Sequence, residues 1–311
     1  MRGNHVRYPP GRGNVWIPVG DARSAAAGLS LLTFSRPLPL AAQRLLHTAA
    51  LRVGPWVLPG RREPWSPPVA EHLWSAVLEQ ATAVAGPADG CAVYLRPQAS
   101  RTGAAVLLLR AGRPVGFLKI REDADELDRE AAVLELLDGG CGTGCRVPEM
   151  LGRGTAAGLS WMMISPMEPV PARPARDVRI DELTARIRER LADLPRPRDV
   201  PAHWEPMHGD LTPWNLRRTR GKVPWLIDWE DTGYGPPGAD EVYYLATRAA
   251  VYGGTVAATG YGEAAAHWHA VVTRRRADDE ELSERLLRAL AVLGRPAAGS
   301  ERSRGTREGR R

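Results

Sequence analysis

The stretch from His203 to Asp231 constrains this chain more than any other part of it. Within it, the triplet His208-Gly209-Asp210 is followed five residues after the aspartate by Asn215, and Asp228 comes thirteen residues later. Asn215 is the only asparagine after residue 14, so its occurrence at this spacing argues against coincidence. A carboxylate can accept the proton of an attacking hydroxyl, while an amide oxygen and a second carboxylate can hold Mg²⁺ against phosphates. The residue types and spacing therefore indicate phosphoryl-transfer chemistry.

The two segments that carry these residues resemble the motifs of a known family. Residues 208–215 read H-G-D-L-T-P-W-N, and residues 227–230 read I-D-W-E. Both are similar to the catalytic loop H-x-D-x-x-x-x-N and the metal-binding strand I-D-W/F-E of the aminoglycoside phosphotransferase and choline kinase-like small-molecule kinases. A protein kinase more often has Arg after the His and Phe-Gly after the metal-binding Asp. The alternative is a His-Gly-Asp turn followed by an unrelated surface aspartate.

This resemblance covers roughly residues 90–250, and it implies a role for each residue of the two motifs. Asp210 takes the position of the catalytic base, and Asn215 and Asp228 take the positions of the Mg²⁺ ligands. His208 is expected to be a structural hydrogen-bonding residue of the loop. Asp240 lies in a segment that resembles the family's G-x-P-x-x-D, whose aspartate caps and braces the helix that follows.

A lysine and a glutamate upstream are predicted to form a buried ion pair. Lysine occurs only at Lys119 and Lys222, so a lysine in a special position is informative. Strand periodicity puts Lys119 on an apolar face, and helical periodicity puts Glu130 on the apolar stripe of a helix over 124–137. Each charge is costly to bury alone, which favours pairing. The resemblance implies that this is the kinase pair that places the α and β phosphates of ATP; a strand-edge lysine and a solvated glutamate are the alternative.

Two further nucleotide contacts are implied by the resemblance alone. Ser165 and Met167 follow a predicted strand and precede a proline-rich stretch, where the family has a hinge whose backbone meets adenine. An ordinary strand exit is the alternative. The loop 97–103 would cover the ATP phosphates, but it has one glycine and so departs from G-x-G-x-x-G.

The apolar periodicity predicts an α+β chain, and with the resemblance a two-lobed protein-kinase-like fold. Residues 1–14 are expected to be loose. The expected helices are 22–32, 39–53, 68–85, 124–137, 180–194, 240–252, 262–275 and 278–293, and the expected strands are 91–96, 104–110, 114–120, 147–152 and 159–163. The predicted parts are a helical N-terminal extension (1–86), a small antiparallel-sheet N-lobe with the hinge (87–167), a mainly helical C-lobe with the catalytic loop and acceptor site (168–294), and a disordered basic tail (295–311).

Other charged residues near the motif receive plainer interpretations. Arg217 and Arg218 could reach phosphate, but solvated arginines are the preferred interpretation in so arginine-rich a chain. Glu230 and Asp231 could touch a metal through water, but surface carboxylates are preferred for them.

Composition limits the classes of partner. The formal net charge is +6, of which the tail carries +4, so the remainder is nearly neutral and no nucleic-acid partner is expected. Three cysteines are too few for a disulfide framework and are expected to be reduced thiols. No apolar run reaches the roughly 18 residues of a membrane span, so no membrane partner and a cytoplasmic location are expected.

The resulting prediction is an ATP- and Mg²⁺-dependent phosphotransferase with an alcohol group as acceptor. It would move the γ-phosphoryl group to a hydroxyl of a small molecule: an aminoglycoside, a sugar or an amino alcohol. The residue types define neither the acceptor nor a preference for ATP over GTP, nor the oligomeric state. The alternative is a non-catalytic, nucleotide-binding, kinase-like regulatory module.

Overall fold

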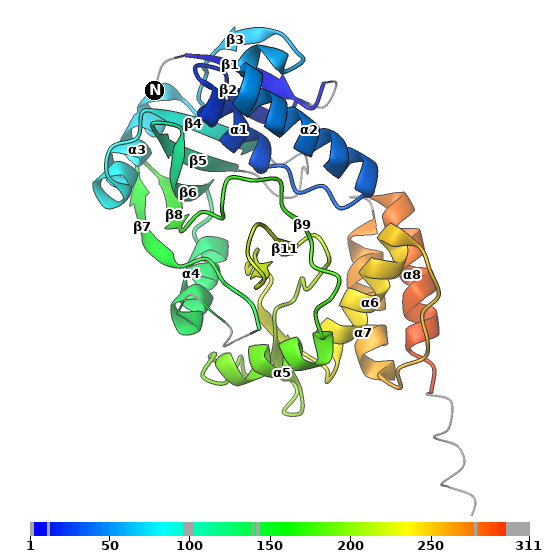
Figure 1. Ribbon diagram of the computed structural model, residues 1–311. Helices are drawn as coiled ribbons and strands as arrows, with labels where there is room; N and C mark the ends of the chain where they lie inside the picture. Colours follow the sequence, from blue (N-terminus) through cyan, green and yellow to red (C-terminus); the bar gives the residue numbers. More distant parts are fainter. Residues whose placement is uncertain are drawn as a thin grey trace, which may run out of the picture. The chain divides into compact units, whose positions relative to one another are not determined.

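A computed structural model describes residues 3–10, 13–95, 103–138, 140, 144–276 and 279–296 (Figure 1). The chain forms two compact units. The first comprises Met1–Asp177 and Trp214–Glu230, and the second comprises Val178–Pro213 and Asp231–Arg311. The predicted phosphate loop, apart from Gly103, and the predicted tail from residue 297 lie outside the described residues.

An antiparallel sheet forms the core of the first unit. Its order, within the described residues, is β3-β1-β2-β4-β5-β6-β8-β7. The strands are β1 (Asn4–Tyr8), β2 (Val15–Pro18), β3 (Arg62–Pro64), β4 (Gly90–Leu95), β5 (Ala104–Arg110), β6 (Arg113–Arg121), β7 (Met150–Ala156) and β8 (Leu159–Ile164). The predicted meander β4-β5-β6 and the later pair β7-β8 are confirmed. Strands β1 to β3 were not predicted, because runs of three to five residues are too short to show a clear period of two. Residues 4–8 form β1, so the expectation that they are loose is wrong.

Four helices of the described chain belong to this unit: α1 (Ala22–Ser30), α2 (Pro37–Val53), α3 (Glu71–Ala85) and α4 (Asp125–Leu137). Helix α1 begins after Asp21, whose carboxylate accepts from the backbone N–H of Arg23 and Ser24 at 2.9 Å, so the predicted cap is present. Helix α3 buries Trp74 and Val77 in the cluster formed by the sheet. All four coincide closely with predicted helices.

A small three-stranded sheet completes the first unit and carries part of the motif region. It has the order β12-β11-β9, with β9 (Arg173–Pro174), β11 (Leu216–Arg218) and β12 (Trp225–Leu226). Strands β11 and β12 form an antiparallel hairpin in which Leu216 lies opposite Leu226. The hairpin places the residue before β11 and the residues after β12 at the same end.

The second unit is mainly helical in its described residues. It contains α5 (Ile180–Arg190), α6 (Ala239–Tyr252), α7 (Gly262–Arg274) and α8 (Glu280–Leu293), together with the paired strands β10 (Glu205–Met207) and β13 (Gly233–Gly235). Helices α6 to α8 share one apolar core. In it Trp268 stacks on Tyr243 with ring centroids 3.9 Å apart, and its indole N–H donates to the carbonyl of Ala239.

Two remaining expectations concern cysteines and membranes. Cys91 is buried and free, whereas Cys145 is in a disulfide, so the expectation that all three thiols are reduced is wrong for Cys145. Cys141 lies outside the described residues. No helix in the described part of the chain combines the length and apolarity that crossing a membrane requires.

Candidate active site

The predicted ion pair between Lys119 and Glu130 is present in the first unit. Lys119 lies near the end of β6, where it faces Met162 of β8 and Ala105 of β5 across the sheet. Glu130 lies on the buried side of α4. The Lys119 Nζ is 2.7 Å from both carboxylate oxygens of Glu130, and the two residues are 5% and 1% exposed. The two charge-assisted hydrogen bonds fix the position of the buried ammonium.

A second carboxylate contacts the same ammonium. The Lys119 Nζ lies 3.2 Å from Oδ1 of Asp228, a residue 109 positions further along the chain. Burial alone would lower the pKa of Lys119, but attraction to Glu130, and then to Asp228 and Glu230, outweighs it and raises the pKa. Lys119 is therefore held as a cation among three carboxylates.

The hairpin β11-β12 positions both predicted metal ligands. Asn215 directly precedes β11, and its carbonyl accepts from the N–H of Ile227, the residue before Asp228. Asp228 has a φ of +69°, in the left-handed region that non-glycine residues rarely adopt. Such a conformation is typical of positions under functional constraint. The Asp228 side chain keeps 29% of its surface exposed, whereas Asn215 is buried.

A buried pair beside this site was not predicted. Arg121, two residues after Lys119, has its Nη2 3.9 Å from Oε2 of Glu230, two residues after Asp228. Both are buried, so the interpretation of Glu230 as a surface carboxylate is wrong. Arg121, the partner of Glu230, lies on β6, more than a hundred residues earlier in the chain. Local motifs do not reveal a contact over that separation. The period-two spacing of two cations on one apolar strand was the available signal.

The catalytic-loop triplet lies in the second unit, where each member has a backbone role. His208 is fully buried, and its Nδ1 accepts from the N–H of Asp210 at 3.1 Å, as expected of a structural residue. Gly209 has a φ of +81°, and a Cβ there would overlap the carbonyl oxygen of Asp231. Only glycine satisfies both conditions without strain. Asp210 thus follows a tightly fixed turn.

Asp240 holds this turn rather than the helix that follows it. Its Oδ2 accepts from the N–H of His208 at 2.8 Å, and its Oδ1 accepts from the N–H of Gly209 at 3.2 Å. The N-cap of α6 is Gly238, with no side-chain cap bond, so the expectation that Asp240 caps the helix is wrong. Burial raises the pKa of Asp240 to about 7, although both backbone hydrogen bonds act to lower it.

The remaining predicted residues lie in the first unit with other partners. Ser165 exchanges hydrogen bonds with the backbone of Glu149: its N–H donates to the carbonyl at 2.8 Å, and its Oγ accepts from the N–H at 2.9 Å. Met167 is half-buried. Arg217 is fully buried and donates to the carbonyls of Phe34 and Ala172, so it is not a solvated arginine.

A known family matches the part of the chain that contains the catalytic-loop and metal-binding motifs. Residues 174–277 match the model of the phosphotransferase enzyme family. The resemblance inferred from the motifs is confirmed. The match also confirms the predicted class of enzyme, a phosphotransferase. It covers Asp210, Asn215 and Asp228, and it leaves Lys119 and Glu130 outside.

Solved structures of such phosphotransferases are weakly similar to this chain. A protein from Haemophilus somnus 129PT described as a fructosamine-3-kinase is 11% identical, with a TM-score of 0.48, over 72% of this chain and 98% of its own. The GDP complex of an aminoglycoside 2'-phosphotransferase-IIIa mutant is 15% identical, with a TM-score of 0.46, over 71% and 95%. Aminoglycoside phosphotransferase APH(3'')-Id from Streptomyces rimosus ATCC10970 is 16% identical, with a TM-score of 0.37, over 71% and 98%. No curated protein matches the chain significantly.

Proposed function

We propose that this chain transfers the γ-phosphoryl group of ATP to a hydroxyl group of a small molecule, with Mg²⁺. The acceptor would be an aminoglycoside, a sugar or an amino alcohol. The observation that supports this most strongly is Lys119, a buried ammonium that Glu130 holds at 2.7 Å and Asp228 contacts at 3.2 Å. Phosphoryl transfer depends mainly on positioned charge, and a cation fixed in advance by two carboxylates supplies it.

The donor chemistry of Asn215 and Asp228 fits Mg²⁺. An amide oxygen and a carboxylate are hard oxygen donors, and Mg²⁺ needs few of them because it keeps water and phosphate oxygens. Both residues lie at one end of the β11-β12 hairpin, and Asp228 retains exposed surface. When bound there, Mg²⁺ would neutralise charge on the phosphates. Asn215 and Asp228 would hold it, while Lys119 would bind phosphate oxygens.

Asp210 would act on the acceptor. The Asp210 carboxylate would orient the acceptor hydroxyl and accept the hydroxyl proton. This role requires a loop backbone that holds the carboxylate in a fixed position. The hydrogen bonds of His208 and Asp240 within the second unit favour such a fixed backbone. The carbonyl of Ser165 and the backbone of Met167 would contribute to adenine binding, as the family's hinge does; the N–H of Ser165 is already bonded to Glu149.

The decisive experiment is Mg²⁺-dependent ATP consumption against a panel of aminoglycosides, sugars and amino alcohols. Wild type is compared with Asp228→Ala and with a control, Asp177→Ala. Asp177 is an exposed aspartate of the same unit that pairs only with Arg218 among the ion pairs of the described chain. We expect acceptor-stimulated turnover in wild type and the control, and none in Asp228→Ala.

Two results would count against the proposal. If wild type binds ATP with Mg²⁺ but turns over no acceptor, the non-catalytic nucleotide-binding module is favoured. If wild type does not bind ATP at all, the roles given to Lys119, Asn215 and Asp228 are wrong.

A further inference from the structure

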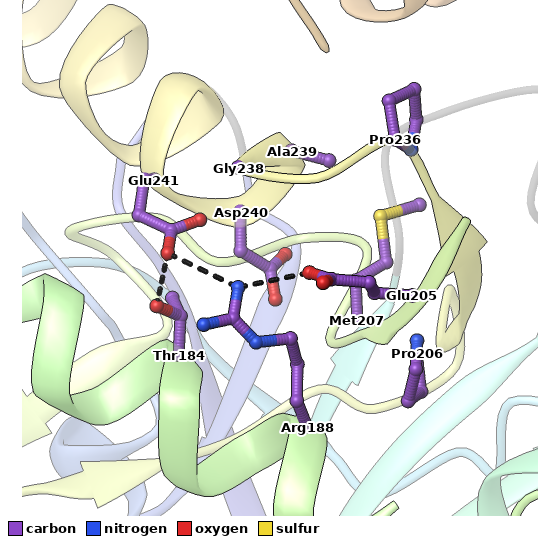
Figure 2. A pocket seen from close by; sticks show the side chains of 10 residues that line it. All are labelled: Thr184, Arg188, Glu205, Pro206, Met207, Pro236, Gly238, Ala239, Asp240 and Glu241. Atoms are coloured by element: carbon purple, nitrogen blue, oxygen red, sulfur yellow. Dashed lines mark hydrogen bonds and ion pairs between the residues drawn. The ribbon is translucent and has the colours of Figure 1, made fainter. Parts of the chain in front are cut away.

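Charged side chains from three elements of the second unit line one pocket (Figure 2). Arg188 of α5 has its Nη1 3.0 Å from Oε2 of Glu205 on β10 and 3.6 Å from Oε1 of Glu241 on α6. Thr184, one turn earlier on α5, donates its hydroxyl to the same oxygen of Glu241. The guanidinium thus lies between two glutamates that belong to different elements, as Figure 2 shows.

Asp240 lies in the same pocket and contacts the loop directly. Its two carboxylate oxygens accept one N–H each, from His208 and Gly209. An ionised carboxylate can accept at both oxygens, whereas a protonated one carries a donor on one of them. Protonation of Asp240 would therefore weaken one of the two hydrogen bonds that fix the turn before Asp210, because the hydroxyl oxygen is a poorer acceptor than a carboxylate oxygen.

We propose that Arg188 is a positioning residue that favours the ionised form of Asp240 and so helps to hold the catalytic loop in place. The effect of Arg188 on turnover rests on the proposed function, because it would act through Asp210. The effect of Arg188 on the charge of Asp240 is argued only from residues of the second unit.

The charges around Asp240 give Arg188 this role. Among the residues that line the pocket, three are acidic, Glu205, Asp240 and Glu241, and Arg188 is the single cation. Without Arg188 the carboxylates would repel one another, and the most buried of them would bind a proton most readily.

Two hydrogen bonds reach the Asp240 carboxylate from the backbone N–H groups of His208 and Gly209, which carry no net charge. The pKa of Asp240 is raised to about 7, mainly by burial; within that balance Glu241 acts to raise the pKa and Arg188 acts to lower it. The group is therefore close to losing its charge near neutral pH, where a neighbouring cation has the greatest effect.

The test measures the titration of Asp240 from the pH dependence of protein stability. This measurement does not require knowledge of the phosphate acceptor. Unfolding is measured from pH 5 to pH 9 for wild type, Arg188→Met and Arg188→Lys, each with and without Asp240→Asn. The difference within each pair reports the ionisation of Asp240. We expect its titration to move up by about one pH unit in Arg188→Met, a tenfold change in proton affinity, and to stay at the wild-type value in Arg188→Lys.

Arg179→Met is the matched control, because Arg179 is an exposed arginine that precedes the same helix and, among the ion pairs of the described chain, pairs only with Asp181 and Glu182. An Asp240 titration in Arg188→Met that equals that of wild type would overturn the proposal. If Arg188→Met does not fold, Arg188→Gln removes the charge while keeping hydrogen-bond donors and decides the same question.

Turnover provides the second readout. The acid limb of the pH profile of kcat should move up with the Asp240 titration in Arg188→Met, while the KM for ATP stays unchanged. A lowered kcat with an unmoved acid limb would show a merely structural role and contradict the proposal. If wild type has no turnover, the proposed function fails, and the stability difference still decides whether Arg188 controls the charge of Asp240.

Discussion

Arg121 and Glu230 lie 3.9 Å apart in the first unit, two residues beyond Lys119 and Asp228 on their respective segments. Because side chains alternate along a strand, Lys119 and Arg121 share one face of β6. Two cations of one strand therefore face two carboxylates of the segment that follows β12. This pairing ties the backbone around Asp228 to β6 at two points.

Breaking the buried Arg121–Glu230 pair should destabilise the protein. Removing one member of a buried pair leaves the other charge buried, so Arg121→Met and Glu230→Gln should each destabilise by about 3 kcal/mol. The double variant should lose much less than the sum, with a coupling of at least about 1 kcal/mol in urea unfolding. The exposed pair Arg179–Asp181 is the control, and its coupling should be much smaller because water screens the two charges. Equal couplings for the two pairs would contradict the argument.

Lys119 should be essential for turnover and also important for stability. Lys119→Met removes the cation and leaves Glu130 buried without a counter-charge, so stability should fall by about 3–5 kcal/mol. Adding Glu130→Gln should restore part of that stability. Turnover should fall by at least about 10²-fold in both variants, because the charge that positions phosphate is gone. Recovery of activity in the double variant, measured as ATP consumption, would refute the role given to Lys119.

Asp210 should act on the chemical step and leave nucleotide binding intact. Asp210→Asn keeps the size of the side chain and removes the base, so kcat should drop by about 10²–10⁴-fold with little change in the KM for ATP. Asp228→Ala should instead weaken Mg²⁺-dependent nucleotide binding. Binding is measured by calorimetry with ADP, with and without Mg²⁺. If Asp210→Asn impairs binding as much as Asp228→Ala does, the division of roles is wrong.

The motifs and the apolar periodicity predicted the elements that have strong local signals. The pairing of Lys119 with Glu130 could be predicted because each charge lies on an apolar face. The contact of Lys119 with Asp228 and the burial of Glu230 could not, because their partners come together only in the folded unit. Likewise Asp240 lies in the first turn of a helix and was expected to cap it; its contacts with His208 and Gly209 depend on tertiary packing.

Gly209 should tolerate no side chain. In Gly209→Ala the new Cβ would overlap the carbonyl of Asp231 and would occupy a φ of +81°. Gly253, with φ of +75°, ψ of −178° and open space around its Cβ position, experiences only the conformational cost of this glycine-favouring region, which is about 1–3 kcal/mol. Gly209→Ala should therefore unfold at a lower temperature than Gly253→Ala and lose turnover, whereas Gly253→Ala should keep it. The comparison is made by thermal unfolding and ATP consumption, and equal behaviour of the two variants would show that the clash is relieved at no cost.

As pH rises, ionisation of Asp240 should lower the stability of the protein while strengthening the hydrogen bonds that hold the catalytic loop. Burial raises its pKa in the folded protein to about 7, from 3.8, so the folded state binds this proton more tightly than the unfolded state. The stability that protonated Asp240 contributes is thus complete below about pH 4 and is lost as pH rises through about 7.

Asp240→Asn cannot ionise and does not lose stability in this way. Relative to wild type, the variant should gain on the order of 4 kcal/mol between pH 4 and pH 8. Its amide group accepts at only one oxygen, so turnover at pH 8 should fall even though the protein is more stable there. Urea unfolding across this range checks the sign. A variant that loses stability relative to wild type as pH rises would mean that Asp240 is ionised throughout, with its charge fully compensated by the loop and by Arg188.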